Sequence, residues 1–155
     1  MAVVVELSKS DDLNQEDDDV PLLGQLQLWA DGACLQDTDV VASMQVLSEK
    51  EMQALNLDFS GKDKPTNVLS FPMQLPEHVD INLLGDLAFC AEIINTEAEQ
   101  QGKSRDAHWA HMVVHGMLHL QGYDHIEDKQ AEIMEQLEVQ ILEKLGFNNP
   151  YETHS

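Results

Sequence analysis

Short apolar runs alternate with longer stretches of helical periodicity along this chain. Four runs rich in β-branched and other apolar residues predict strands, over Ala2–Leu7, Thr38–Leu47, Asn67–Met73 and Leu83–Phe89. Apolar residues at helical spacing predict five helices: one that starts at Pro21 and runs through Trp29, one from the capping box of Ser48 and Glu51 to near Leu57, and then Cys90–Gln101, Ser104–Gln121 and Glu127–Leu145. The pattern therefore predicts a domain that mixes helices and strands.

The helix predicted over Ser104–Gln121 is apolar on almost every side. Away from its histidines it carries seven large apolar residues, namely Trp109, Met112, Val113, Val114, Met117, Leu118 and Leu120. A helix of this kind is buried within its domain. We therefore expect a central helix whose histidines open into a cleft. The last helix has a one-sided stripe, made of Ala131, Met134, Leu137, Ile141 and Leu145, and should pack on the outside.

Composition sets the class of protein. The 155 residues, 43% hydrophobic and 24% charged, suit a single domain over residues 1–155 with a proper core. No apolar run approaches the length needed to cross a bilayer, and the start of the chain lacks the basic region of a signal peptide. Cys34 and Cys90 match neither a zinc ribbon nor a redox pair. We expect a cytoplasmic protein without a dinucleotide cofactor or a membrane partner.

The net charge of −21 predicts weak non-specific attraction to nucleic acids. Four of the eight basic residues nevertheless fall shortly before the histidine-rich helix: Lys62, Lys64, Lys103 and Arg105. If a phosphate backbone docks on this protein, we expect it to dock there.

The segment from His115 to His125 has the spacing of a metal site. His115 and His119 lie one helical turn apart on the same face, so their imidazoles can reach one ion. Gly122 can take the left-handed conformation that ends a helix, which would let the chain return His125 to the same ion. Three nitrogen ligands leave a fourth position for water, as in catalytic zinc sites. The spacing predicts one Zn²⁺ held by these three histidines.

Two further histidines belong to the same helix but do not fit the same ion. His111 and His119 would lie about 12 Å apart along the helix axis, which one ion cannot span. We expect His108 and His111 to support the ligands, to line the pocket or to be packed polar residues.

One class of zinc peptidases shares this histidine spacing. Those enzymes carry a glutamate directly after the first histidine as the general base, and here that position is Gly116. Peptide hydrolysis by the usual route is therefore disfavoured. A zinc hydrolase acting on another substrate, such as a phosphodiester, fits the sequence better.

The segment H-G-M-L-H-L-Q-G-Y-D-H closely resembles the signature of the YbeY family of bacterial endoribonucleases. The resemblance includes K-D-K-P-T-N-V-L-S-F-P, L-L-G-D-L and H-W-A-H-M-V-V-H-G upstream, and Y-D-H-I-E-D downstream. It covers the chain from about Val40 to Tyr151 and is weak over the first 35 residues.

This resemblance implies an activity and a fold. The activity is that of a single-strand-specific, metal-dependent ribonuclease of the bacterial cytoplasm, which matures the 3′ end of the small-subunit ribosomal RNA and takes part in ribosome quality control. The implied fold is α+β and zincin-like, with a small mixed four-stranded sheet packed with helices around a buried central metal-binding helix. The family's three ligands match His115, His119 and His125.

One position departs from the family pattern. Relatives usually have an arginine just before the G-K-D/H-x-P-T segment, and this chain has Ser60. Serine lacks the charge and the two-pronged donor geometry with which arginine binds phosphate. We expect activity that is reduced but not absent, with Lys62 or Lys64 as the substitute charge that binds the substrate.

The general base is not settled by the sequence. Asp86 is a weak candidate for the general base. The alternative is that its side chain makes a structural hydrogen bond. Asp124 is a second weak candidate catalytic residue: it either hydrogen-bonds a ligand imidazole or caps the following helix. Thr66 and Asn67 either line the cleft or form the turn into a strand.

Two alternatives stay open beside the ribonuclease hypothesis. One is a zinc metallopeptidase-like hydrolase, and the other is a non-catalytic ribosome-assembly factor with a structural metal. Because the chain is so acidic, we expect it to work on ribosomal particles or with a protein partner that delivers ribosomal RNA.

Overall fold

The computed structural model describes residues 3–10, 20–35, 39–73, 83–124 and 126–151, which form four strands and five helices. The strands β1 (Val3–Lys9), β2 (Val40–Leu47), β3 (Val68–Pro72) and β4 (Leu83–Cys90) make one sheet in the order β1-β2-β4-β3. The pairs β1/β2 and β2/β4 are parallel, whereas β3 runs antiparallel to β4 at the edge of the sheet. Pro72 ends this edge strand, where its missing N–H costs no sheet hydrogen bond.

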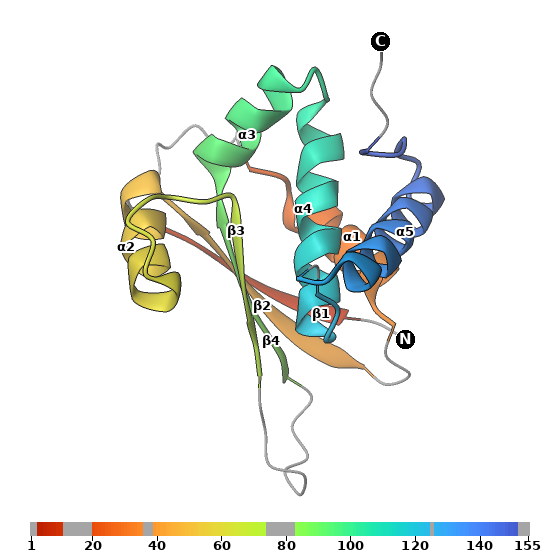
Figure 1. Cartoon of the computed structure of the whole chain (residues 1–155), viewed down its shortest axis with the longest axis horizontal. Coiled ribbons are helices and arrows are strands. Elements are labelled where there is room, and N and C mark those ends of the chain that lie inside the picture. The colour runs from red at the N-terminus through yellow and green to blue at the C-terminus, as the bar shows by residue number, and fades with distance from the viewer. Residues whose placement is uncertain (1–2, 11–19, 36–38, 74–82, 125, 152–155) are drawn as a thin grey trace, which may run out of the picture.

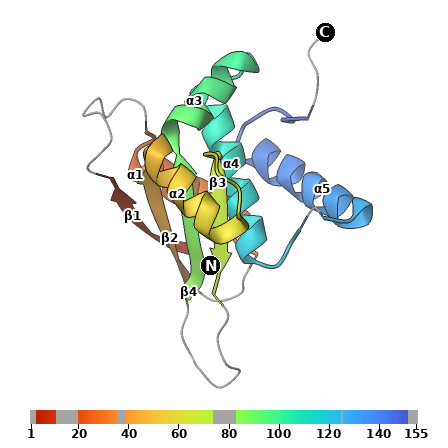
Figure 2. The same cartoon turned by 60° about the vertical axis from the view of Figure 1, so that its left-hand side comes forward.

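The helices lie in layers on the two faces of the sheet (Figures 1 and 2). Helix α2 (Glu49–Ser60) covers one face alone. Helices α1 (Leu23–Ala33) and α4 (Arg105–Leu120) lie on the other face, with α3 (Ala91–Gln100) packed beside α4. Helix α5 (Asp128–Lys144) packs against α4 from outside. Helix α4 is therefore enclosed by the sheet and three helices.

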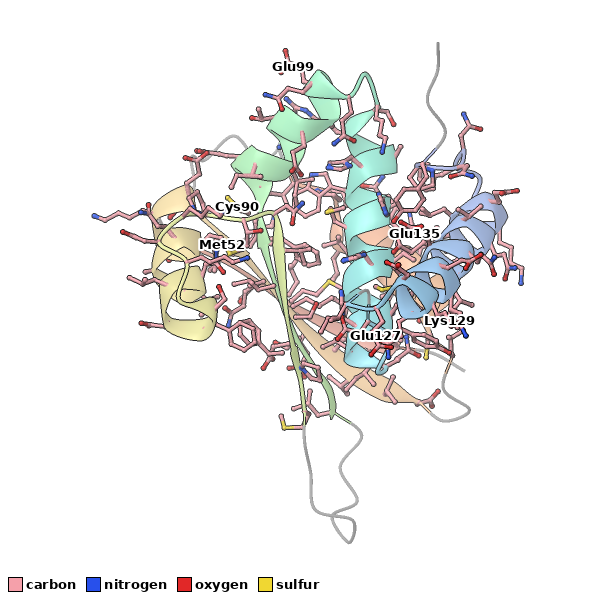
Figure 3. The ribbon with its side chains drawn as sticks, viewed as in Figure 1. Met52, Cys90, Glu99, Glu127, Lys129 and Glu135 are labelled. Atoms are coloured by element: carbon pink, nitrogen blue, oxygen red, sulfur yellow. The ribbon has the colours of Figure 1, made fainter. Side chains whose placement is uncertain are left out.

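Two apolar cores follow from this layering. The larger one fills the space between the sheet and α1, α4 and α5, and includes Phe89 of β4 packed on Trp109 of α4. The smaller one lies under α2 and consists of Met52, Ala88 and Cys90 (Figure 3, where Met52 and Cys90 are labelled). Alternate residues of β4 thus serve opposite faces, as the pleat of a strand requires.

Two glycines let α4 approach the sheet closely. A Cβ added at Gly116 of α4 would lie 2.8 Å from a methyl carbon of Leu87. Gly85 of β4 has φ 151°, and a Cβ there would lie 2.5 Å from the carbonyl oxygen of Phe71 and 2.7 Å from a methyl carbon of Leu120. Neither contact leaves room for a side chain.

The expected elements are confirmed in type and order within the described residues. The expectation of a mixed α+β fold with a four-stranded sheet is confirmed, and α4 is buried as its composition predicts. The start of the first helix was predicted wrongly: α1 begins at Leu23, with Leu22 as its N-cap, and not at Pro21. A search of the described helices finds none with the length and apolar character needed to span a membrane.

The apolar stripe expected on the last helix coincides only in part with the face of α5 that is buried. Met134 and Ile141 are buried as expected, but Glu138 and Leu142 are buried with them. The expected stripe residues Ala131, Leu137 and Leu145 are half-buried. A carboxylate thus lies in the middle of the helix face that meets α4.

Candidate metal centre

Helix α4 presents two histidines to a pocket at the edge of the sheet. The N-cap of this helix is Ser104, whose hydroxyl oxygen accepts a hydrogen bond from the Ala107 N–H at 3.1 Å. About three and about four turns later, His115 and His119 are half-buried beside a pocket of about 320 Å³. The rest of the pocket is lined by the residues that lead into β3 and form it: Thr66, Asn67, Val68, Leu69 and Ser70.

The two imidazoles are placed as ligands of one ion would be. Their Nε2 atoms are 3.2 Å apart. Two nitrogens each about 2.0–2.1 Å from one tetrahedral zinc ion are separated by about 3.3 Å, so the observed spacing fits a shared cation. The donor set, neutral imidazole nitrogen, is one that zinc prefers. These two histidines therefore fit two of the ligand positions of a zinc ion.

A carboxylate on α5 contacts His115 on the side of the ring that faces away from His119. Glu138 is 1% exposed, and its Oε1 lies 3.0 Å from Nδ1 of His115. Its Oε2 lies 2.5 Å from Nε2 of His111 and accepts a hydrogen bond of 2.7 Å from the Tyr151 hydroxyl. Burial by itself would raise the pKa of this carboxyl, but the hydrogen bonds from His111 and His115 outweigh burial and lower the pKa to about 2. Glu138 is therefore ionised at neutral pH.

The same carboxylate changes the pKa of Tyr151. Burial of its hydroxyl and the adjacent charge of Glu138 both raise the pKa of Tyr151 well above its ordinary value. Its hydroxyl thus stays protonated and donates.

A second histidine–carboxylate pair lies at the other end of the histidine stripe. His108 is buried, and its Nε2 lies 3.0 Å from Oε1 of Glu97, which also accepts a hydrogen bond of 3.1 Å from the Asn67 side chain. Burial lowers the pKa of His108, and the hydrogen bond to Glu97 offsets this only partly. His108 and His111 are thus packed, hydrogen-bonded polar residues, which is one of the roles the sequence allowed. Neither lines the pocket.

The sequence of this chain matches a known protein family. The family model described as Endoribonuclease YbeY matches residues 14–146. The chain belongs to the YbeY family. Membership supports a role as an endoribonuclease in the processing of ribosomal RNA.

A solved structure extends the likeness to the whole chain. The solution structure of TM1509 from Thermotoga maritima is 25% identical to this chain, with a TM-score of 0.56. The match covers 97% of this YbeY-family chain and 99% of that one. The two proteins therefore share a fold over the matched part of each chain.

The structure brings together some of the sequence-predicted site residues. Thr66 and Asn67 join His115 and His119 around the pocket, and Gly122 has the positive φ, 99°, that the return of the chain requires. The third predicted ligand, His125, lies outside the described residues. Among the residues that are described, no group of three or more His, Cys, Asp or Glu side chains could hold a metal ion.

The two acidic candidate residues, Asp86 and Asp124, are not among the residues that line the pocket. Asp86 lies on β4 between Gly85 and Leu87, which both face α4, so its side chain is on the face of the sheet that α2 covers. Asp124 is half-buried in the turn after α4. It does not cap the following helix, because the N-cap of α5 is Glu127.

The two lysines are exposed in the loop between α2 and β3 and are not among the pocket-lining residues. This loop is fastened to the end of α2. The Ser60 hydroxyl lies 2.9 Å from the carbonyl oxygen of Asn56 and 2.6 Å from its Oδ1, and the Asn56 side chain donates a hydrogen bond of 2.8 Å to the carbonyl oxygen of Lys64. Ser60, at the position of the family's arginine, thus helps to hold the loop that leads into Thr66.

Sequence reasoning missed Glu138 and Tyr151. One signal was present for Glu138: it interrupts the apolar spacing of Met134 and Ile141 on a helix face expected to be buried. No local signal pointed to Tyr151, because its partner lies 13 residues away on another element.

Proposed function

We propose that this protein is a zinc-dependent endoribonuclease specific for single-stranded RNA. It would mature ribosomal RNA in the cytoplasm, at the 3′ end of the small-subunit RNA, and take part in ribosome quality control. The observation that carries the proposal is the pair of Nε2 atoms, 3.2 Å apart, at a pocket beside an edge strand. Membership of the YbeY family supports ribonuclease chemistry rather than another hydrolysis.

In this proposal His115, His119 and His125 hold the zinc ion. When bound, zinc acts as a Lewis acid and activates water near neutral pH. Thr66, Asn67 and Ser70 supply hydroxyl and amide groups along the opposite wall of the pocket, where they can donate hydrogen bonds to the sugar–phosphate backbone.

In this proposal, groups around the pocket orient the Asn67 side chain and supply positive charge for the RNA. Glu97 accepts a hydrogen bond from the Asn67 side chain and so fixes which way that amide points. Lys62 and Lys64, exposed on the adjoining loop, neutralise phosphate charge as the RNA approaches. Asp86 has no part in the proposal, because its side chain is on the other face of the sheet.

The metallopeptidase alternative gains no support from the packing of α4. Gly116 stands where such peptidases carry their glutamate, and it faces Leu87 of the sheet at a distance that leaves no room for a side chain. A glutamate there would not reach a substrate in the pocket.

The proposal is tested by metal analysis of the purified protein together with cleavage of a single-stranded RNA. We expect about one equivalent of zinc, cleavage that a chelator abolishes and zinc restores, and no cleavage by His115→Ala. A duplex RNA and casein serve as substrates that should remain intact. Cleavage that survives both the chelator and His115→Ala would contradict the proposal.

The cost of the missing arginine is measured in the same assay with Ser60→Arg. We expect faster cleavage, because a guanidinium adds a charge and a two-pronged donor near the loop that carries Lys62 and Lys64. Ser60→Ala is the control, since it removes the bond to Asn56 without adding charge. Equal rates for wild type and Ser60→Arg would show that this position does not limit the reaction.

A further inference from the structure

Glu138 is a buried carboxylate that contacts two histidines of the neighbouring helix at once. It comes from α5, whereas His111 and His115 come from α4. Each of its oxygens has its own partners: Oε1 serves His115, and Oε2 serves His111 and Tyr151. A buried carboxylate requires such donors, because an ionised group without them would be strongly destabilising.

The contact to His115 has a consequence for the opposite side of that imidazole ring. Oε1 of Glu138 lies 3.0 Å from Nδ1 of His115, and a carboxylate oxygen is a hydrogen-bond acceptor, so the contact is made by a proton on Nδ1. In a neutral ring this leaves Nε2 with its lone pair. That Nε2 is the atom 3.2 Å from Nε2 of His119, at the pocket.

We propose that Glu138 is the positioning residue of the metal site, which fixes both the tautomer and the ring orientation of His115. The inference rests on the proposed function, because it assigns Glu138 a role toward the zinc ion. A ligand histidine usually donates its other ring N–H to a carboxylate or carbonyl, and losing that partner costs about 10–100-fold in metal affinity. Glu138 meets this description by distance, burial and charge.

Tyr151 and His111 hold the positioning residue in place. Their donors, at 2.7 and 2.5 Å from Oε2, occupy the oxygen that does not serve His115. The carboxylate therefore cannot rotate away from His115 without losing two hydrogen bonds. This assigns His111 a supporting role in the site and ties the docking of α5 to the geometry of the ligands on α4.

The experiment measures zinc affinity by competition with a chromophoric chelator. We expect Glu138→Gln, which keeps the shape but removes the charge, to bind zinc about 10–100-fold more weakly than wild type. Tyr151→Phe should weaken binding in the same direction by less, because it removes one of the donors that hold the carboxylate. Glu132→Gln is the matched control, with the same change at an exposed position of the same helix, and should bind like wild type.

A second readout separates positioning from a merely structural role. In metal-free protein at about pH 8, where free imidazoles are neutral, the ring nitrogen-15 shifts of His115 report which nitrogen carries the proton. We expect the Nδ1–H form in wild type and a mixture of tautomers in Glu138→Gln. If Glu138→Gln does not fold, the wild-type tautomer and the zinc affinity of Tyr151→Phe still decide the question.

The inference and the proposed function can fail separately. Wild-type protein that binds zinc, with Glu138→Gln binding it equally tightly or with the proton of His115 on Nε2, would overturn the role of Glu138 and leave the zinc site standing. Wild-type protein that binds no zinc at all would overturn both.

Discussion

Three histidines of α4 are each matched to a carboxylate from another helix. His108 meets Glu97 of α3, and His111 and His115 share Glu138 of α5. Uncompensated, any of these groups would oppose folding, since burial penalises both a charge and an unpaired polar atom. The pairs let a mostly apolar helix carry these three histidines on one side and still pack within the domain.

His108 should make the stability of the protein depend on pH. Burial is the main reason that the pKa of His108 is lowered in the folded state. Lys103 and His111 lower this pKa further, and Glu97 raises it without cancelling the effect of burial. As pH falls below about 6.5 the unfolded chain therefore takes up this proton before the folded one does, and stability is lost.

We expect the free energy of unfolding of wild type to fall more steeply between pH 7 and 5 than that of His108→Gln, whose side chain can still donate to Glu97. Urea unfolding across this range measures the difference. Parallel curves for the two proteins would show that His108 does not contribute to the pH dependence.

Gly116 should tolerate no large side chain. A glutamate there would place a Cβ 2.8 Å from a methyl carbon of Leu87 and a charge in the apolar core. We expect Gly116→Glu to lower the free energy of unfolding by at least about 3 kcal/mol, as measured by urea titration. The matched control is Gly24→Glu, on an exposed stretch of α1 with nothing within 4 Å of the added Cβ, which should change stability by less than about 0.5 kcal/mol.

At the scale of elements, a local signal explains where α2 begins. Ser48 and Glu51 form the reciprocal capping box predicted for α2: the Ser48 N–H donates to Glu51 at 3.0 Å, and the Glu51 N–H donates to the Ser48 hydroxyl oxygen at 3.2 Å. Such caps involve residues three apart in sequence, so a sequence pattern can reveal them. The start of α1 was missed because its cap is different in kind: the Gln25 side chain accepts from the Leu22 N–H at 3.1 Å, with no capping hydroxyl before it.

Removing the cap of α2 should cost stability without changing the fold. We expect Ser48→Ala to lower the free energy of unfolding by about 0.5–2 kcal/mol, because the Glu51 N–H loses its acceptor. Lys50→Ala, an exposed change one residue into the same helix, is the control and should have little effect. A loss for Ser48→Ala no larger than that for Lys50→Ala would mean that the cap contributes nothing net.

At the scale of the whole molecule, charge opposes the proposed substrate. The chain carries a net charge of −21, with eight basic residues in all. Non-specific affinity for RNA comes mainly from cations that neutralise phosphates, and this protein has few to offer. We therefore expect recognition of RNA to draw on contacts other than phosphate attraction, such as those that a ribosomal particle or a protein partner would provide.

This leads to a prediction about binding. At about 150 mM salt we expect free single-stranded RNA to bind with a Kd no tighter than about 10⁻⁶ M, and ribosomal particles to bind at least about tenfold more tightly. Filter binding or sedimentation with His115→Ala, which should not cleave, measures both. Single-stranded DNA of the same sequence controls for simple charge attraction. Equal affinity for free RNA and for particles would contradict the prediction.

The sequence by itself determined the type and order of the described elements and the one-turn spacing of His115 and His119. Apolar periodicity and caps act over a few residues, so β2, α2, α4 and their neighbours could be predicted from the chain alone. The spacing of His115 and His119 required only that α4 be a helix.

Only the tertiary structure decided which distant groups support that pair. The docking of α5 on α4 brings Glu138 to His115, and the antiparallel pairing of β3 with β4 brings Thr66 and Asn67 to the same pocket. The alternation of β4 turns Asp86 to the other face. These outcomes depend on how elements pack across many residues of separation, a choice governed by burial of the whole apolar surface and not by any local pattern.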